Sequence, residues 1–173
     1  MSYQFNSLKV LVVDDNAHMR SLISRILHAY GIYTIYDAAD AEQAWQVISV
    51  NPLDIILLDW VLEGMNGVEL TDKIRNAPDS PNSFVPIIMV SGYSSKECVN
   101  AARDAGVTEF LAKPVSAKTI LSRLIAAIEH PRPFVRTASY FGPCRRRRID
   151  PFYKGPERRT ESAEGNASTL DAA

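Results

Sequence analysis

Five short apolar runs alternate with stretches of helical hydrophobic spacing up to residue 129, and this alternation restricts the fold more than any other feature. After the first run, for example, Met19, Leu22, Ile23 and Ile26 recur at spacings of three and four, as on one face of a helix. This alternation is typical of parallel strand–helix–strand units, which are almost always right-handed. It predicts an open parallel sheet with helices on both faces. The strands are expected at 8–13, 32–38, 54–59, 86–92 and 108–114.

The alternation ends near residue 129, because the following HPRPF places two prolines where a helix cannot continue. Charge changes at the same point. Residues 1–130 hold 10 Lys and Arg against 15 Asp and Glu, residues 131–159 hold 9 against 2, and residues 160–173 hold none against 3. We therefore expect an acidic folded domain at 1–130, an irregular arginine-rich extension at 131–159, and a disordered acidic end at 160–173.

Several classes of protein are disfavoured by what the sequence lacks. There is no run near the roughly 18 apolar residues that cross a bilayer, and the start MSYQFNSLKV has no basic and apolar leader. We therefore expect a cytoplasmic protein without a transmembrane segment. Cys98 and Cys144 have no His or Cys at ligand spacing, which argues against a disulfide framework or a zinc site. The extension lacks helix-turn-helix periodicity, so no DNA-binding domain is expected.

Polar side chains gather where the expected strands end. Asp14 and Asp15 follow the first strand, and Asp59, Ser91 and Lys113 fall at the ends of the third, fourth and fifth. The carboxyl ends of parallel strands share one edge of a sheet, where ligands collect. Any one acid alone would be explained as a helix N-cap, but polar residues at four strand ends favour a site. Crowded carboxylates need a cation, and hard oxygen ligands suit Mg²⁺. With a hydroxyl and an ammonium nearby, the site suits a phosphoryl group.

The motifs at these strand ends, VVDDN, LLDW, VSGY and EFLAKP, resemble those of the receiver domain of two-component response regulators, the CheY-like family. The resemblance covers residues 8–129. It implies a flavodoxin-like (βα)5 fold, a doubly wound parallel sheet with strand order 2-1-3-4-5, here followed by the irregular extension. It also implies a phospho-accepting switch protein that dephosphorylates itself and turns over no outside substrate, and which is therefore not an enzyme.

The resemblance assigns roles to the acidic residues. It implies that Asp59 accepts a phosphoryl group from a histidine kinase or a phosphotransfer protein. It also implies that Mg²⁺ is held by Asp15, Asp59 and the backbone carbonyl of Val61, with Asp14 reaching the metal through water. A metal-dependent phosphatase on a similar scaffold is a competing interpretation, but Val61 stands where such enzymes carry a second acid.

The resemblance also implies a switch. Lys113 would pair with the phosphate, Ser91 would move to bond a phosphate oxygen, and the ring of Phe110 would then turn inward. Val61 and Tyr93 border the route of the hydrolytic water in the family, so their identity here leaves the lifetime of the phosphate open.

A motif is repeated in the extension. YFGPCRR at 140–146 returns as YKGPERR at 153–159, so each copy combines a tyrosine, Gly-Pro and paired arginines. Arginine can donate to O6 and N7 of guanine, stack on a base and neutralise phosphate. A ligand with two guanines and two phosphates related by a twofold axis would match a duplicated unit of this kind. Cyclic di-GMP is such a ligand.

Residues 132–159 resemble the arginine-rich C-terminal segment of a group of CheY-like cyclic di-GMP effectors, which are linked to flagellar motor control and surface attachment. Arg132 and Arg136 are candidate contacts. The matching positions imply stacking platforms at Tyr140 and Tyr153 and ligand contacts at Arg145, Arg146, Arg147, Arg148, Arg158 and Arg159.

Two functions stay open on the sequence alone. The first is a two-component response regulator without a DNA-binding output domain, whose phospho-switch and cyclic di-GMP-binding extension control a protein partner, with the flagellar motor as a candidate. The alternative is a stand-alone phosphorelay receiver whose basic extension binds nucleic acid or acidic membrane nonspecifically. The salt dependence of binding distinguishes the two functions, because nonspecific polyanion binding weakens steeply with salt and does not depend on base identity.

Overall fold

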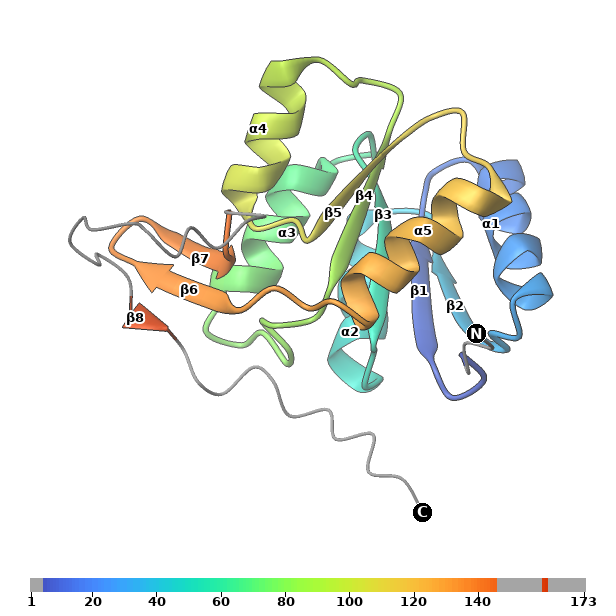
Figure 1. Cartoon of the computed structure of the whole chain (residues 1–173), viewed down its shortest axis with the longest axis horizontal. Coiled ribbons are helices and arrows are strands. Elements are labelled where there is room, and N and C mark those ends of the chain that lie inside the picture. The colour runs from blue at the N-terminus through green and yellow to red at the C-terminus, as the bar shows by residue number, and fades with distance from the viewer. Residues whose placement is uncertain (1–4, 146–159, 162–173) are drawn as a thin grey trace.

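The computed structural model describes residues 5–145 and 160–161. Its central element is a parallel sheet in the order β2-β1-β3-β4-β5, which confirms the predicted fold (Figure 1). Helices cover both faces, so the central strands are apolar and buried along nearly their full length. The strand bounds are β1 Lys9–Val13, β2 Thr34–Ala38, β3 Ile55–Asp59, β4 Ile87–Ser91 and β5 Glu109–Ala112.

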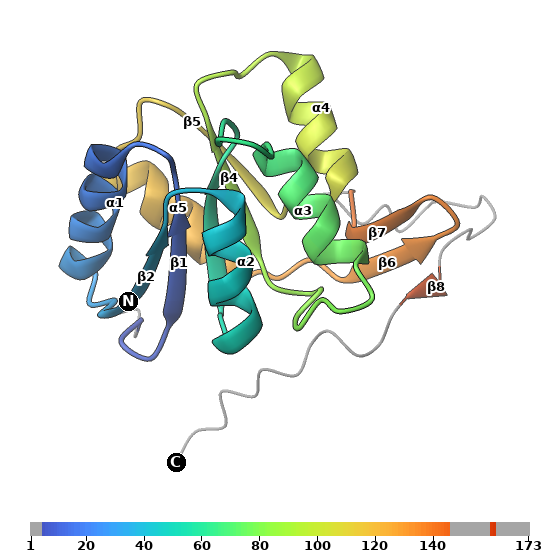
Figure 2. The ribbon, with the colours of Figure 1, turned by 180° about the vertical axis from the view of Figure 1, so that it is seen from behind.

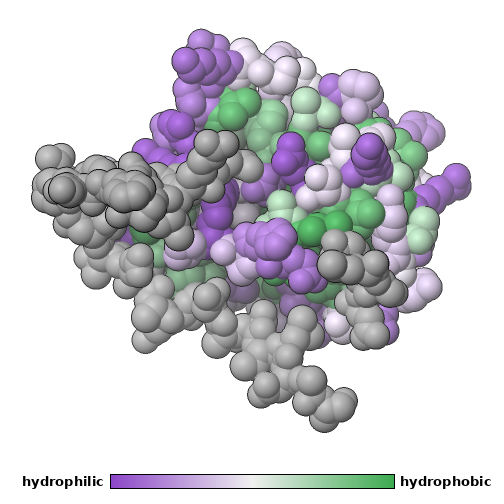
Figure 3. All heavy atoms as spheres, in the orientation of Figure 1, coloured by the Kyte–Doolittle hydropathy of each residue, from purple (hydrophilic) through white to green (hydrophobic). Residues whose placement is uncertain are grey.

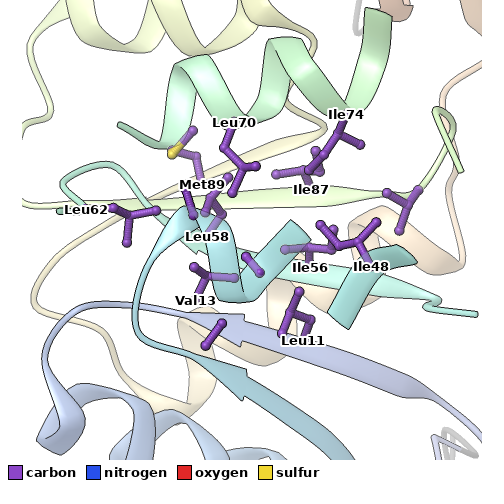
Figure 4. Packing of buried hydrophobic residues seen from close by; sticks show 14 of the residues in the cluster. Leu11, Val13, Ile48, Ile56, Leu58, Leu62, Leu70, Ile74, Ile87 and Met89 are labelled. Carbon is purple, nitrogen blue, oxygen red and sulfur yellow. The ribbon is translucent and has the colours of Figure 1, made fainter. Parts of the chain in front are cut away.

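The described residues contain the helices α1 (Ala17–Ala29), α2 (Ala41–Val50), α3 (Gly67–Asn76), α4 (Lys96–Ala105) and α5 (Ala117–Ile128), and none of these has the length and apolar composition of a membrane span. α1 and α5 pack on one face of the sheet, and α2, α3 and α4 lie on the other (Figures 1 and 2). An apolar cluster fills each interface. In the cluster of Figure 4, side chains of β1, β3 and β4 meet those of α2 and α3, among them Leu11, Val13, Ile48, Ile56, Leu58, Leu70, Ile74, Ile87 and Met89.

Polar residues ahead of each helix fix where the helices begin. One polar side chain before each helix accepts hydrogen bonds from backbone N–H groups in the first turn. These N-caps are Asn16 for α1, Asp40 for α2, Asn66 for α3, Ser95 for α4 and Ser116 for α5. Each cap comes a few residues after the end of a strand. The caps therefore fix the loops at the carboxyl edge of the sheet, where the site is predicted.

The register of the sheet brings the predicted site residues to that edge. Val13 pairs with Leu58, and Ser91 pairs with Ala112. Asp59 is the last residue of β3, one position beyond the pair that ends β1. Adjacent strands from β1 to β5 therefore stop at nearly the same level, and the residues that follow them share one end of the sheet.

After α5 the chain forms a small antiparallel sheet, which replaces the irregular extension expected from the sequence. β6 (Phe134–Thr137) and β7 (Tyr140–Pro143) make a hairpin, and β8 (Thr160–Glu161) pairs with the other side of β6. The acidic end that was expected to be disordered thus begins with a strand. Its remaining residues, 162–173, lie outside the described part of the chain.

The hairpin packs against α3 and α4 (Figures 1 and 2). Phe134 and Phe141 of the hairpin meet Phe84 of the loop after α3, with ring centroids 5.1 and 5.2 Å from that of Phe84 and 5.6 Å from each other. Beside them, the backbone of Gly142 lies against Gly106, which ends α4. A Cβ on Gly142 would fall 2.8 Å from the Gly106 Cα, so two glycines make this backbone approach possible.

Arginine side chains help to join the hairpin to the domain. Arg75 of α3 is buried, and it donates to the carbonyls of Gly106 at 3.0 Å and Ser83 at 2.8 Å. Its guanidinium carbon lies 5.1 Å from the centre of the Phe134 ring, and burial lowers the pKa of Arg75 to about 9. Arg132 donates to backbone carbonyls on both sides of the junction. The hairpin is therefore packed as part of the folded unit.

Candidate acidic site at the carboxyl edge of the sheet

Three carboxylates lie together at the carboxyl edge of the sheet. Asp14 and Asp15 follow β1, Asp59 ends β3, and one carboxylate oxygen of each lies within 4.8 Å of the others. Asp14 and Asp59 are buried, whereas Asp15 is exposed. Negative charges at this spacing repel each other, and the repulsion is relieved by a cation.

Lys113, the first residue after β5, brings one cation to the acids. Its Nζ donates to Asp14 Oδ2 at 3.0 Å and to Asp59 Oδ2 at 2.9 Å. Burial acts to lower the pKa of Lys113, but the hydrogen bonds and charges of the two aspartates outweigh burial and raise that pKa. Burial is the main cause that raises the pKa of Asp59; Lys113 opposes it and the charge of Asp14 adds to it. The lysine stays charged, while the ionised form of Asp59 is held at an energetic cost.

Arg20 holds the loop that carries two of the acids, and the sequence pattern did not single it out. Its Nη1 donates to the backbone carbonyls of Asp14 at 2.7 Å and Asp15 at 3.3 Å. Its Nε pairs with Asp37 of β2 at 3.3 Å. The backbone N–H of Asn16 donates to Asp14 Oδ1 at 2.9 Å, which orients that carboxylate. The one sequence signal for this role is an arginine one turn into the helix that follows the acid pair.

The predicted switch residues lie on the neighbouring strands. Ser91 is buried at the end of β4, and its Oγ accepts a hydrogen bond from the backbone N–H of Tyr93 at 2.9 Å. Phe110 of β5 is partly buried against the apolar cluster beneath α2 and α3. Val61 and Tyr93 are 47% and 60% exposed. The loops after β3 and β4 therefore present these two side chains to solvent.

The donor set fits a hard divalent cation. Mg²⁺ takes oxygen ligands, and in proteins it is bound through one or two carboxylates while keeping several waters. Asp15 and Asp59 offer those carboxylates, and Asp14 lies close enough to act through a water. Val61, whose carbonyl is the remaining predicted ligand, is two residues past the end of β3. Such an ion would offset the negative charge that a single lysine leaves unbalanced.

Two of the predicted nucleotide contacts meet in the extension. The guanidinium carbon of Arg145 lies 4.0 Å from the centre of the Tyr140 ring, and Arg145 Nη1 is 3.4 Å from Asp104 Oδ1 on α4. The Tyr140 hydroxyl donates to the Pro143 carbonyl at 2.7 Å, and burial raises the pKa of that hydroxyl against the opposing effect of Arg145. The other predicted contacts lie outside the described residues: Arg146, Arg147, Arg148, Tyr153, Arg158 and Arg159.

The two further candidates in the extension are placed differently. The guanidinium carbon of Arg136 lies 4.0 Å from the centre of the Phe141 ring, and the residue lines an open pocket of about 310 Å³ at the hairpin turn. Arg132 is turned toward the domain and donates to the carbonyls of Thr108 and Cys144. Arg132 thus has a structural role in the junction, whereas Arg136 faces a pocket.

Comparison with known proteins shows in which proteins similar sequences and this fold occur. The family model of the response regulator receiver domain matches residues 10–125. The chemotaxis protein CheY1 of Helicobacter pylori is 32% identical over 118 residues, which are 68% of this chain and 94% of that protein. The chemotaxis protein CheY-3 of Vibrio cholerae is 29% identical over 118 residues, 68% of this chain and 89% of that protein.

Solved structures give the same result. The chemotaxis protein CheY4 of Vibrio cholerae has a TM-score of 0.62 and 31% identity, and the match covers 68% of this chain and 95% of that one. CheY in the CheX–CheY–BeF3–Mg²⁺ complex of Borrelia burgdorferi has a TM-score of 0.61 and 25% identity, covering 69% and 88%. With the fold, the strand-end acids and the family match in agreement, the chain belongs to the response regulator receiver domain family, the phospho-accepting switch modules of two-component signalling.

Proposed function

We propose that this protein is a phospho-switch in which Asp59 accepts a phosphoryl group from a histidine kinase or a phosphotransfer protein. The observation that carries the proposal is the cluster of Asp14, Asp15 and Asp59 with Lys113 bonded to two of them. In the transfer, a bond forms between an Asp59 carboxylate oxygen and phosphorus while the phosphorus–nitrogen bond of a phosphohistidine donor breaks. The protein is a switch, not an enzyme with an outside substrate.

We propose Mg²⁺ as the cofactor, held by Asp15, Asp59 and the Val61 carbonyl, with Asp14 acting through water. The Borrelia burgdorferi complex, in which CheY is accompanied by BeF3 and Mg²⁺, supports this choice. The ion would neutralise charge on the transferring phosphoryl group. Lys113 would exchange its Asp59 bond for a phosphate oxygen.

The buried switch residues would convert the phosphate into a change of shape. Ser91 Oγ, which now accepts from the Tyr93 N–H, would donate to a phosphate oxygen. That movement would leave room for the partly buried Phe110 ring to turn further inward.

Phosphorylation is tested by treating the full chain with acetyl phosphate and measuring its intact mass. We expect a mass gain of one phosphoryl group that requires Mg²⁺ and disappears in Asp59→Ala. Asp79→Ala, in an exposed loop, is the matched control and should keep the gain. A wild-type protein without a Mg²⁺-dependent gain, or an Asp59→Ala protein that still gains mass, would contradict the proposal.

We further propose that the extension binds cyclic di-GMP and thereby controls a protein partner, with a flagellar motor component as the first candidate. The stack of Arg145 on Tyr140 supports this, because it presents a flat guanidinium of the kind that stacks on bases. The duplicated motif supports a twofold ligand. In this proposal the chain divides into a receiver at 1–130, the arginine-rich extension at 131–159 and an acidic end at 160–173, and acts in the cytoplasm.

The second candidate is nonspecific polyanion binding, which the excess of 9 Lys and Arg over 2 Asp and Glu in residues 131–159 favours. Calorimetry on the full chain with cyclic di-GMP, cyclic di-AMP and a short RNA, at two salt concentrations, separates the two. We expect binding of cyclic di-GMP that exceeds that of cyclic di-AMP at both salts and is lost in Arg158→Ala/Arg159→Ala. A Lys96→Ala/Lys118→Ala control removes equal charge from the domain and should bind normally. Equal affinity for all three ligands with a steep salt dependence would support the second candidate.

A further inference from the structure

We propose that Asp104 of the receiver forms part of the cyclic di-GMP site, where it reads the guanine edge beside the Tyr140–Arg145 stack. This inference rests on the proposed binding of cyclic di-GMP by the extension. It adds to that proposal a receiver residue and a location, the C-terminal end of α4. The ligand would then bridge the extension and the domain.

The first copy of the repeated motif is docked on the receiver. Its Phe141 is buried against Phe84, and its Gly142 lies against Gly106 at the end of α4. The Tyr140 hydroxyl donates to the Pro143 carbonyl, which fixes the ring relative to the hairpin. Docking therefore holds the aromatic and the arginine of this copy in place before any ligand arrives, and such preorganisation lowers the entropy cost of binding.

The stack has the shape of a base-binding platform. Tyr140 covers one face of the Arg145 guanidinium at 4.0 Å, while the Arg145 side chain keeps 42% of its surface exposed. A purine can therefore stack on the guanidinium face that points away from Tyr140. Hydrophilic residues lie over the upper end of α4 in Figure 3, and the helix sequence KECVNAARDA is largely polar with Ala102 as its one buried residue, so the exposed surface of α4 suits a polar, charged ligand better than an apolar one.

Asp104 supplies what arginine lacks, a hydrogen-bond acceptor. Its Oδ1 lies 3.4 Å from Arg145 Nη1 and 3.1 Å from Arg103 Nε, and its side chain is 50% exposed. Guanine presents O6 and N7 acceptors on one edge, which suit arginine, and N1–H and N2–H₂ donors on its Watson–Crick edge, which suit a carboxylate. Adenine has a bare N1 acceptor in the matching position and would face the carboxylate unfavourably. A carboxylate held beside a stacked arginine therefore selects guanine over adenine.

The ion pair between Arg145 and Asp104 contributes little to the free energy of folding. Pairs between exposed side chains contribute little, because solvent screens them and ordering two side chains costs entropy. A change at Asp104 should therefore leave the fold intact, so that an effect on binding can be read separately from folding.

The test compares Asp104→Asn with wild type in the full chain. Calorimetry with cyclic di-GMP and cyclic di-AMP should show that Asp104→Asn binds cyclic di-GMP about tenfold to a hundredfold more weakly, the range expected for a bidentate base contact. Affinity for cyclic di-AMP should stay equal or rise, so the preference for guanine collapses. Arg145→Lys, which keeps the charge but loses the flat stack, should weaken both ligands. Asp79→Asn is the control and should bind as wild type does.

The outcomes separate this inference from the proposal beneath it. If wild type shows no preference for cyclic di-GMP, the proposed nucleotide function fails, and this inference falls with it. If wild type binds cyclic di-GMP selectively and Asp104→Asn binds it equally well with an unchanged melting temperature, the nucleotide function stands and the role of Asp104 is overturned.

Discussion

Asp59 shows at the scale of one residue how the site conflicts with stability. The fold buries Asp59 to 5% exposure, next to Asp14, and burial raises the pKa of its carboxyl above the ordinary value. A buried group whose pKa is raised favours the folded state when it is protonated. That favourable contribution is present below the unfolded pKa and is lost as pH rises through the folded pKa of Asp59. At neutral pH the ionised side chain therefore weakens the metal-free fold.

We expect Asp59→Asn to raise the melting temperature of the metal-free protein at pH 7 by a few degrees, because the amide removes the buried charge. The gain should shrink as pH falls through the raised pKa of Asp59, because the carboxylate of the wild type then becomes protonated. Thermal melts in EDTA across this pH range check the prediction. Asp79→Asn, in an exposed loop, should shift the melting temperature little at any pH. A loss of stability in Asp59→Asn at pH 7 would contradict this account.

Residues at or just after the ends of buried strands could be placed from the sequence, whereas the arginines that bind loop carbonyls could not. Asp14, Asp59 and Lys113 come together because strand ends in a parallel sheet share an edge, and the apolar runs mark those ends. Arg20 and Arg75 act through backbone carbonyls of loops brought to them by tertiary packing. No spacing along the chain encodes such partners, so their roles appear only in the structure.

At the scale of elements, the hairpin is the feature that the sequence concealed. β6 and β7 are four residues each and include Gly142 and Pro143, both unfavourable in strand interiors, so no alternating pattern is visible. The hairpin is held in position by its packing against Phe84 and Gly106. α4 depends on the same packing, because Ala102 is its one buried residue and β7 is one of the elements that contact it.

Gly142→Val should detach the hairpin from α4. A Cβ at this position would lie 2.8 Å from the Gly106 Cα and 2.7 Å from the Tyr140 hydroxyl, and steric overpacking of this kind costs about 1–3 kcal/mol. We expect faster amide exchange in 134–143 and in α4, measured by hydrogen exchange with mass spectrometry. Gly92→Ala is the control, since a Cβ there meets no atom within 4 Å. Unchanged exchange in Gly142→Val would show that the hairpin is not held at this contact.

At the scale of the whole molecule, α4 connects the two candidate sites. It begins at the Ser95 cap, four residues after Ser91, and it ends at Gly106, against which the hairpin packs. One helix therefore contacts the switch loop at one end and the docked motif at the other. A helix with a single buried residue can shift at a low free-energy cost, so a structural change at one end of α4 can alter the contacts at its other end.

We therefore expect the phosphoryl mimic and cyclic di-GMP to alter each other's binding. Mg²⁺ with beryllofluoride should change the cyclic di-GMP affinity of the full chain by about fivefold or more, and cyclic di-GMP should change beryllofluoride affinity by the same factor, because coupling is reciprocal. Calorimetry in both orders measures the two factors. In Gly142→Val, where the hairpin is detached, both factors should fall toward one. Independent binding in wild type would exclude α4 as a link.

The docked hairpin also has a practical consequence for work on isolated receivers. A fragment that stops at residue 130 keeps the sheet and its helices but loses Phe134 and Phe141, the ring partners of Phe84. It also loses the Phe134 ring that lies 5.1 Å from the guanidinium carbon of the buried Arg75. Two such fragments can shield each other's exposed patch, so light scattering on the shortened protein should report a dimer that the intact chain does not form.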